Sequence, residues 1–199
     1  MNIDTNAPIQ KLINYFNDRI SLTKKDEALI AASYKTIEIK KKGFLFQQGE
    51  ICNQEGFVTK GTFRVFYSDE KGLEHVLYFA FENWWVGDIA SFYEQEPSRL
   101  SVQALEDSQL LIIERAEKEK IYQEIPALEK VFRIITQKHL TVLQKRFLIT
   151  VSANVETRYN ELLQRCPGIE QLVPQHQIAS YLGILPESLS RMKKQLIKK

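Results

Sequence analysis

The sequence is poor in cysteine and histidine, the residues that most transition-metal centres need. Its two cysteines, Cys52 and Cys166, lie more than a hundred residues apart, and its three histidines, His75, His139 and His176, are isolated from one another. Two thiols cannot hold an iron–sulfur cluster, and no zinc-ligand spacing exists. We therefore predict that both cysteines are inert thiols in a reducing compartment and that the chain holds no metal.

Long apolar runs, secretory signals and catalytic motifs are also missing. No stretch approaches the roughly 20 apolar residues of a membrane span, and the N-terminus lacks the basic and apolar segments of a signal peptide. There is no nucleophile–base pair and no glycine-rich phosphate loop followed by Lys-Ser or Lys-Thr. We therefore predict a cytoplasmic protein that has no membrane partner and is not an enzyme.

The composition that remains is that of an ordinary globular protein. Of the 199 residues, 44% are hydrophobic and 26% are charged, enough for one sizeable domain or two small ones. The hydrophobic pattern is helical from Leu12 to about Ser33, and short alternating runs follow as far as about Arg115. Glycines at the corners between these runs predict a small antiparallel β-barrel or sandwich. The runs are 36–40, 44–46, 56–58, 62–67, 75–81, 100–105 and 109–113.

A second helical pattern follows Pro126. Side chains recur every three and four positions in a narrow seam, which is typical of a coiled coil rather than of a helix lying on a core. The seam consists of Leu128, Phe132, Ile135, His139, Val142, Arg146 and Ile149. We predict a long dimerisation helix. The alternative is a helix packed on its own barrel, with His139 and Arg146 at the edge.

The segment from Gln175 to Arg191 fits a helix-turn-helix. Ala179 is small where two helices would cross closely, and Gly183 suits a tight turn with a left-handed backbone. The residues spaced to bury the inner faces of the pair are Ile178, Leu182, Ile184, Leu189 and Met192. The polar positions left exposed on the second helix, where DNA bases and phosphates would lie, are Glu187, Ser188, Arg191 and Lys194. The alternative is a plain hairpin of two helices.

The distribution of charge supports a DNA-binding C-terminus. The formal net charge of the whole chain is only +2, which by itself would argue against nucleic acid. Residues 187–199, however, contain five basic side chains and one acidic side chain, so the other residues carry a net charge of −2. Basic charge is therefore concentrated where the second helix is predicted, as expected of a DNA-binding protein.

With barrel, long helix and helix-turn-helix in that order, the chain resembles the CRP/FNR family of bacterial transcription regulators over nearly its whole length. In the barrel the resemblance rests on Gly43, Gln48-Gly49-Glu50, Gly61, Gly72, Gly87-Asp88-Ile89 and the strand 101–105. It implies an α+β fold with a jelly-roll-like, antiparallel β-roll sensor of the cyclic-nucleotide-binding type over 1–125. A dimerisation helix and linker would follow over 126–150, and a DNA-binding domain over 151–199. It also implies that Glu187, Ser188 and Arg191 reach into the major groove.

The resemblance places a ligand site at Gly87, Asp88 and Ile89, where the sequence departs from the family. Cyclic-nucleotide binders have glutamate at the position of Asp88 and a phosphate-binding arginine at the position of Ser98. Arg99 lies one residue off, and such a shift on an extended segment points a side chain to the opposite face. The candidate ligand residues are therefore Gly87, Asp88, Ile89 and Arg99, and the missing arginine argues against cyclic AMP as the effector.

A second departure is the C-terminus. The sequence ends eight residues after Arg191, so we expect no full β-hairpin wing after the helix-turn-helix. We predict that Lys193, Lys194, Lys198 and Lys199 contact phosphates instead. The leading hypothesis is a homodimeric regulator that binds a double-stranded DNA operator, RNA polymerase and an unidentified small-molecule effector. The competing hypothesis is a ligand-binding or protein-interaction β-roll whose helical tail docks on a protein partner.

Overall fold

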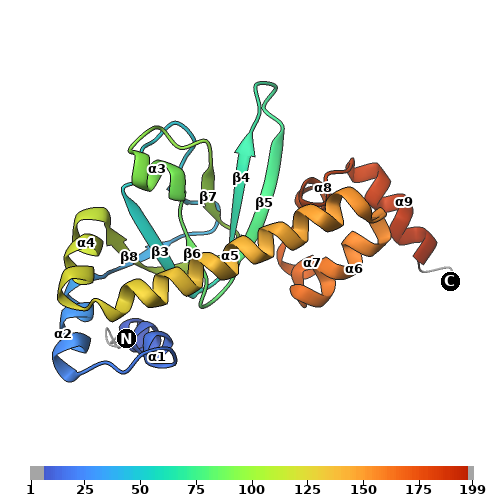
Figure 1. The fold of residues 1–199 in the computed structure, drawn as a ribbon. Helices are drawn as coiled ribbons and strands as arrows, with labels where there is room; N and C mark the ends of the chain where they lie inside the picture. Colours follow the sequence, from blue (N-terminus) through green and yellow to red (C-terminus); the bar gives the residue numbers. More distant parts are fainter. Residues whose placement is uncertain (1–6, 197–199) are drawn as a thin grey trace.

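The computed structural model describes residues 7–196, in which two helices, a β-roll and a series of six helices follow one another. The long helix α5 runs from the roll to the C-terminal helices (Figure 1). The elements before it are α1 (Ala7–Asn17), α2 (Lys24–Ser33), β1 (Lys35–Ile39), β2 (Phe44–Phe46), β3 (Gln54–Lys60), β4 (Phe63–Ser68), β5 (Glu74–Ala80), β6 (Trp85–Val86), α3 (Ile89–Glu94), β7 (Ser101–Ala104), β8 (Ser108–Glu114) and α4 (Arg115–Glu124). The remaining ones are α5 (Ala127–Ser152), α6 (Val155–Arg165), α7 (Ile169–Leu172), α8 (Gln175–Leu182) and α9 (Pro186–Leu196).

The strands form two antiparallel four-stranded sheets that enclose an apolar core. One sheet has the order β1-β8-β3-β6 and the other β2-β7-β4-β5. Alternate side chains of both sheets meet between them, among them the buried Val58, Phe63, Val65, Val102 and Leu110. The predicted α+β fold with an antiparallel β-roll is confirmed, and each predicted strand lies within two residues of an observed one at either end.

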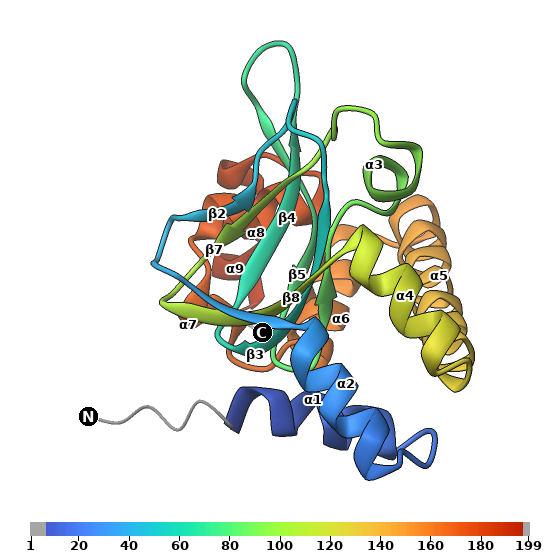
Figure 2. The same cartoon turned by 90° about the vertical axis from the view of Figure 1, so that its left-hand side faces the viewer.

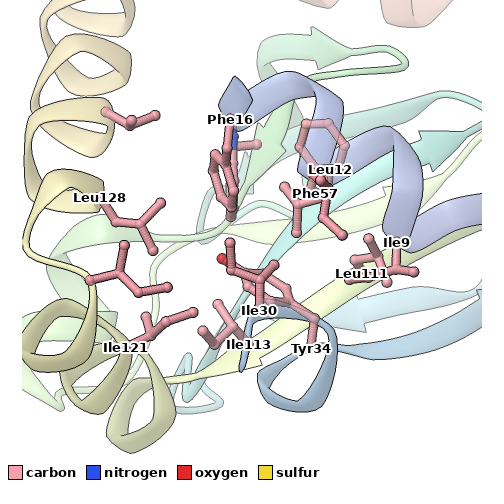
Figure 3. Packing of buried hydrophobic residues seen from close by; sticks show 14 of the residues in the cluster. Ile9, Leu12, Phe16, Ile30, Tyr34, Phe57, Leu111, Ile113, Ile121 and Leu128 are labelled. Carbon is pink, nitrogen blue, oxygen red and sulfur yellow. The ribbon is translucent and has the colours of Figure 1, made fainter. Parts of the chain in front are cut away.

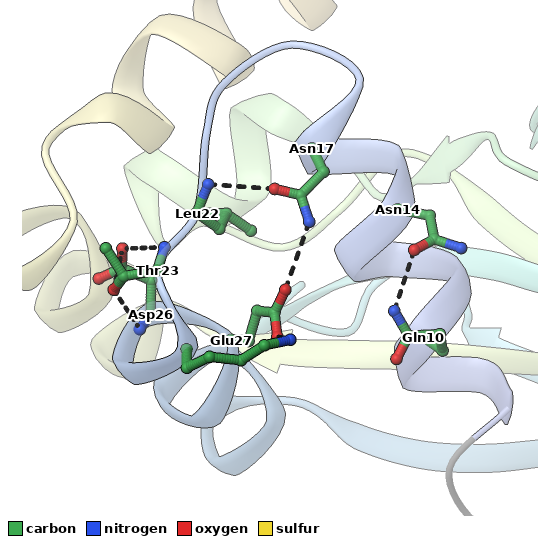
Figure 4. Close-up of polar contacts among 8 residues, drawn as sticks. Gln10, Asn14, Asn17, Leu22, Thr23, Asp26 and Glu27 are labelled. Carbon is green, nitrogen blue, oxygen red and sulfur yellow. Dashed lines mark hydrogen bonds and ion pairs between the residues drawn. The ribbon is translucent and has the colours of Figure 1, made fainter.

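The N-terminal helical stretch, predicted as continuous, is two helices. Thr23 starts the second one with a capping box, because its hydroxyl accepts from the Asp26 N–H at 3.2 Å and its N–H donates to the Asp26 carboxylate at 2.9 Å. The Asn17 carboxamide oxygen accepts from the Leu22 N–H at 3.0 Å and closes the loop between the helices (Figure 4). The prediction for this stretch is corrected: the segment Thr-Lys-Lys-Asp from Thr23 to Asp26 marks the start of a second helix.

The first half of α5 packs on its own β-roll. Leu128 and Ile135 lie in one buried cluster with Phe16 of α1 and Phe57 of β3 (Figure 3). Figure 2 shows α4 and α5 together along one side of the roll. The predicted seam is therefore wrong as a dimer interface in this part of the helix, because burial in the chain's own core produces the same three-and-four spacing. The described part of the chain contains no helix long and apolar enough to cross a membrane.

A different face of α5 is apolar and exposed. Phe147 has 67% of its surface exposed, and its neighbours on this face are similarly accessible. We call this face the outer stripe; it consists of Leu140, Leu143, Phe147, Leu148 and Val151. At about 1.5 Å per residue, the stripe extends for roughly 16 Å along the second half of the helix.

Candidate DNA interface and ligand cavity

The helices α8 and α9 are joined by the tight turn that Gly183 was predicted to form. The backbone of Gly183 is left-handed, with φ 67° and ψ 36°. Its N–H donates to the Ser180 carbonyl, and the N–H of Ile184 donates to the Ala179 carbonyl, each at 3.0 Å. This pair of bonds is a Schellman motif, which ends a helix at a residue with positive φ. The inner faces meet as predicted, since one apolar cluster contains Ile178, Ala179, Leu182, Ile184, Leu189 and Met192.

The predicted DNA-facing side chains lie together on α9. Glu187 and Ser188 are in its first turn and Arg191 is in the next, and the Arg191 guanidinium donates to the Ser188 hydroxyl at 3.1 Å. Glu187, Arg191 and Lys194 are exposed, and Ser188 is half-buried. The start of α9 therefore presents an anion, a hydroxyl and a cation to solvent, a set that can hydrogen-bond to base edges in a major groove.

Lys193 differs from the prediction because it turns back to the protein. Its ammonium pairs with the Glu170 carboxylate on α7. Hydrogen bonds from Lys193 and from the Tyr159 hydroxyl hold the pKa of Glu170 below its ordinary value. The ion pair of Lys193 thus joins α9 to α7, whereas the exposed Lys194 can bind a phosphate. The other two predicted phosphate contacts, Lys198 and Lys199, lie outside the described residues.

The first helix of the motif is fastened to the β-roll. β5 is an edge strand, and the Ser180 hydroxyl of α8 accepts from its Val76 N–H at 2.9 Å and donates to its Glu74 carbonyl at 2.5 Å. Arg146 of α5 donates to the carbonyls of Val76 at 3.1 Å and Tyr181 at 2.9 Å. Sequence reasoning missed Ser180 and placed Arg146 in the dimer seam. Both roles depend on contacts between distant segments, which no local pattern indicates.

Asp88 is used within the protein. Its carboxylate caps α3 by accepting from the N–H groups of Ala90 at 3.1 Å and Ser91 at 3.4 Å. Its second oxygen accepts from the Ser98 hydroxyl at 2.7 Å, and both side chains are buried. Ser98, at the position where the family resemblance implies a phosphate-binding arginine, therefore bonds to Asp88 instead.

Two of the four predicted ligand residues line a cavity and two do not. The cavity has a volume of about 150 Å³ and lies between α3, α5 and the sheet that contains β3 and β6. Gly87 and Ile89 line it. Asp88 is turned into the cap of α3, and Arg99 is exposed and does not belong to the lining.

An ion pair that the sequence did not reveal also lines this cavity. The Lys118 ammonium of α4 bonds to the Glu55 carboxylate of β3, and both residues belong to the lining. Lys118 stands in a strongly charged helix, Arg-Ala-Glu-Lys-Glu-Lys, in which nothing distinguishes it from its solvent-exposed neighbours. Within residues 7–196 no group of three His, Cys, Asp or Glu side chains could hold a metal ion.

The β-roll, the long helix beside it with a cavity between the two, and the docked helix-turn-helix define the architecture of the chain. Comparison with known proteins agrees with this architecture. Residues 36–124 match the family model of the cyclic nucleotide-binding domain. A comparison with curated protein sequences finds no match.

Solved structures with the same fold cover nearly the whole chain. FixK2 from Bradyrhizobium japonicum superposes with a TM-score of 0.70 at 17% identity, over 83% of this chain and 85% of that one. CLP from Xanthomonas campestris, a c-di-GMP-responsive global regulator, gives 0.73 at 15% identity, over 88% and 92%. A regulator of the CRP/FNR family from Eubacterium rectale gives 0.70 at 19% identity, over 90% and 84%. The chain therefore has the fold of CRP/FNR transcription regulators, and the predicted resemblance is confirmed.

Proposed function

We propose that this protein is a sequence-specific, DNA-binding transcription regulator that works as a homodimer and responds to an effector in its β-roll. The observation that carries the proposal is the helix-turn-helix of α8 and α9. Its inner face is buried, and the first turns of α9 present Glu187, Ser188 and Arg191 to solvent. Such a helix places its N-terminal side chains against base edges in the major groove.

The outer stripe of α5 supports the homodimer. Its apolar residues lie on the surface of a single chain, and a second copy of the same helix would cover them in an isologous interface. Two recognition helices related by a two-fold axis would read a palindromic operator. RNA polymerase remains an expected further partner of such a regulator.

The elements around the ligand cavity support a response to an effector. Tyr78 of β5 and His139 of α5 line the cavity. The same two elements hold α8 through Val76 and Arg146. A ligand that moved either wall would act on elements in direct contact with the DNA-reading motif, which gives the coupling a physical route.

DNA binding is tested by selecting duplexes from a random-sequence library with the full chain and measuring their affinity at two salt concentrations. We expect a selected palindromic sequence whose affinity falls steeply with salt, because several phosphates are neutralised. Absence of both sequence selection and salt dependence would favour the competing hypothesis, a β-roll whose helical tail docks on a protein.

The homodimer is tested by Phe147→Asp, which places a charge in the centre of the outer stripe. We expect the sedimentation equilibrium of this variant to shift to monomer and its operator affinity to fall at least tenfold. Lys138→Asp places the same side chain at an exposed position on the opposite side of the helix from Phe147 and should remain dimeric. A dimeric Phe147→Asp variant would show that the outer stripe is not the interface.

A further inference from the structure

The ion pair beside the cavity is deeply buried. The Lys118 side chain is 3% exposed and the Glu55 side chain 13%. Taking two charges out of water is costly, and well-packed apolar residues of similar size often stabilise a fold equally well or better. A buried ion pair on the wall of a cavity can therefore also bind a ligand in that cavity.

The surroundings of Lys118 leave it hydrogen-bonding capacity. Its ammonium lies 4.3 Å from the ring centre of Phe132 and 5.3 Å from that of Phe92. An ammonium has three donors. Glu55 accepts from it, and the Tyr93 hydroxyl lies at 3.5 Å. A ligand oxygen in the cavity can accept from the third donor, and the Glu55 carboxylate can in turn accept from a ligand hydroxyl.

The size and walls of the cavity favour one ring. A volume of about 150 Å³ suits a single benzene-sized ring. The walls around it include the rings of Tyr78, Trp85 and Phe132. Ile89 and Tyr93 belong to the lining and are also about half exposed, so the cavity can be entered between them.

The charge of the cavity is already balanced. In the described part of the chain, its lining contains one lysine, one glutamate and no arginine. Burial lowers the pKa of His139, with Arg165 lowering it further against the opposing effect of Glu55, and burial raises the pKa of Tyr78. Both rings are therefore uncharged near neutral pH. Because Asp88 takes the first amides of α3, a phosphate or carboxylate in the cavity would have no free cation to pair with.

We propose that this cavity binds a compact, uncharged ring compound of the size of phenol, whose hydroxyl group hydrogen-bonds to the Lys118–Glu55 pair. The inference rests on the proposed function, because it specifies the chemical class of the effector. An uncharged ligand would distinguish this protein from sensors of charged nucleotides, because the charges of its cavity are already paired within the protein.

The test is calorimetric titration of the full chain with phenol, benzene, benzoate and cyclic AMP. We expect saturable binding of phenol, benzene and benzoate each weaker by about tenfold or more, and no saturable heat from cyclic AMP. Benzene lacks the hydroxyl, and benzoate brings a charge without a partner. The proposal is overturned if phenol does not bind, if benzoate binds more tightly than phenol, or if cyclic AMP saturates the protein.

Two variants locate the binding site. Ile89→Trp fills the cavity entrance and should abolish phenol binding, whereas Ala90→Trp, at the next and exposed position, should not. The double variant Glu55→Leu/Lys118→Met removes both charges and both hydrogen-bonding groups together and leaves neither partner unpaired. It should bind phenol and benzene equally well, so that the tenfold preference disappears. If that preference persists, the pair only joins α4 to β3 and the proposal fails.

DNA affinity measured on the same preparations separates this inference from the proposed function. Selective, salt-dependent DNA binding by a protein that does not bind phenol would overturn the inference and leave the regulator intact. Phenol binding by a protein that selects no DNA sequence would overturn the proposed regulator and leave the ligand assignment of the cavity intact.

Discussion

The helix-turn-helix and the ligand cavity use polar side chains in opposite ways. On α9, Glu187 and Arg191 are exposed and available to an external partner. Around the cavity, Lys118 pairs with Glu55, and Asp88 bonds to Ser98 and to the start of α3. The proposed DNA-binding end therefore keeps its charges available to a charged partner. At the cavity the charges are compensated within the protein, which suits the uncharged ligand that we propose.

This difference separates effects on stability from effects on binding. Buried groups at either end contribute to the free energy of unfolding, because their partners cannot turn to water when they are removed. Exposed groups of α9 contribute mainly to DNA affinity. Four substitutions test this division, beginning with the one of largest expected effect.

The largest effect is expected at the centre of the helix-turn-helix. Leu189 is fully buried, and Leu189→Ala should lower the free energy of unfolding by about 2–5 kcal/mol. Leu185→Ala removes the same atoms from an exposed position and should change it by less than about 0.5 kcal/mol. Urea denaturation of both variants measures the difference. Equal, small losses would mean that α9 is not packed as described.

The next effect is expected at the start of α3, where Ser98 donates to Asp88. Ser98→Ala removes the donor to Asp88 and the acceptor for the Leu100 N–H, and should cost about 1–3 kcal/mol. Ser21→Ala, at an exposed position, is the matched control. A Ser98→Ala variant as stable as the control would contradict the internal compensation of Asp88.

A smaller effect distinguishes two adjacent lysines of α9. Lys194→Ala should reduce the slope of log affinity against log salt by about 0.9, the value for one phosphate contact, for every DNA sequence alike. Lys193→Ala should leave that slope unchanged, because Lys193 pairs with Glu170. Fluorescence anisotropy at several salt concentrations compares them. Equal slopes in the two variants would contradict the assignment of Lys194 to a phosphate contact and of Lys193 to the ion pair with Glu170.

The smallest effect is a dependence of stability on pH. Burial lowers the pKa of His139 below the ordinary histidine value of about 6.5, so the unfolded chain binds more protons than the folded one as the pH falls below that value. The stabilisation is present above pH 6.5 and is lost as the pH falls toward the folded pKa. Melting temperatures from pH 7.5 to 5 should show a smaller decrease for His139→Gln, and His176→Gln, at an exposed position, should keep the wild-type decrease.

The parts of the fold that sequence predicted are those set by local sterics. A left-handed turn favours a glycine such as Gly183, and a close crossing of two helices favours a small residue such as Ala179. Runs that alternate between apolar and polar residues favour a sheet with one buried face. The predicted helix-turn-helix and β-roll follow from these requirements.

The parts that sequence did not predict depend on what distant segments place opposite a residue. Leu128 and Ile135 have the spacing of a coiled-coil seam, and only the position of α1 and the roll makes them core. Lys118 becomes a buried cation because Glu55 and four aromatic rings surround it. Ser180 becomes a cap for β5 only when α8 docks there.

The most direct test of a DNA reader on α9 is the base preference of Arg191→Ala on the selected operator, measured with a panel of single base-pair changes. We expect the affinity to fall by about 1–3 kcal/mol, the preference at one base pair of each half-site to disappear, and the melting temperature to stay unchanged. Unchanged affinity and an unchanged preference at every base pair would contradict the assignment of α9 as the recognition helix.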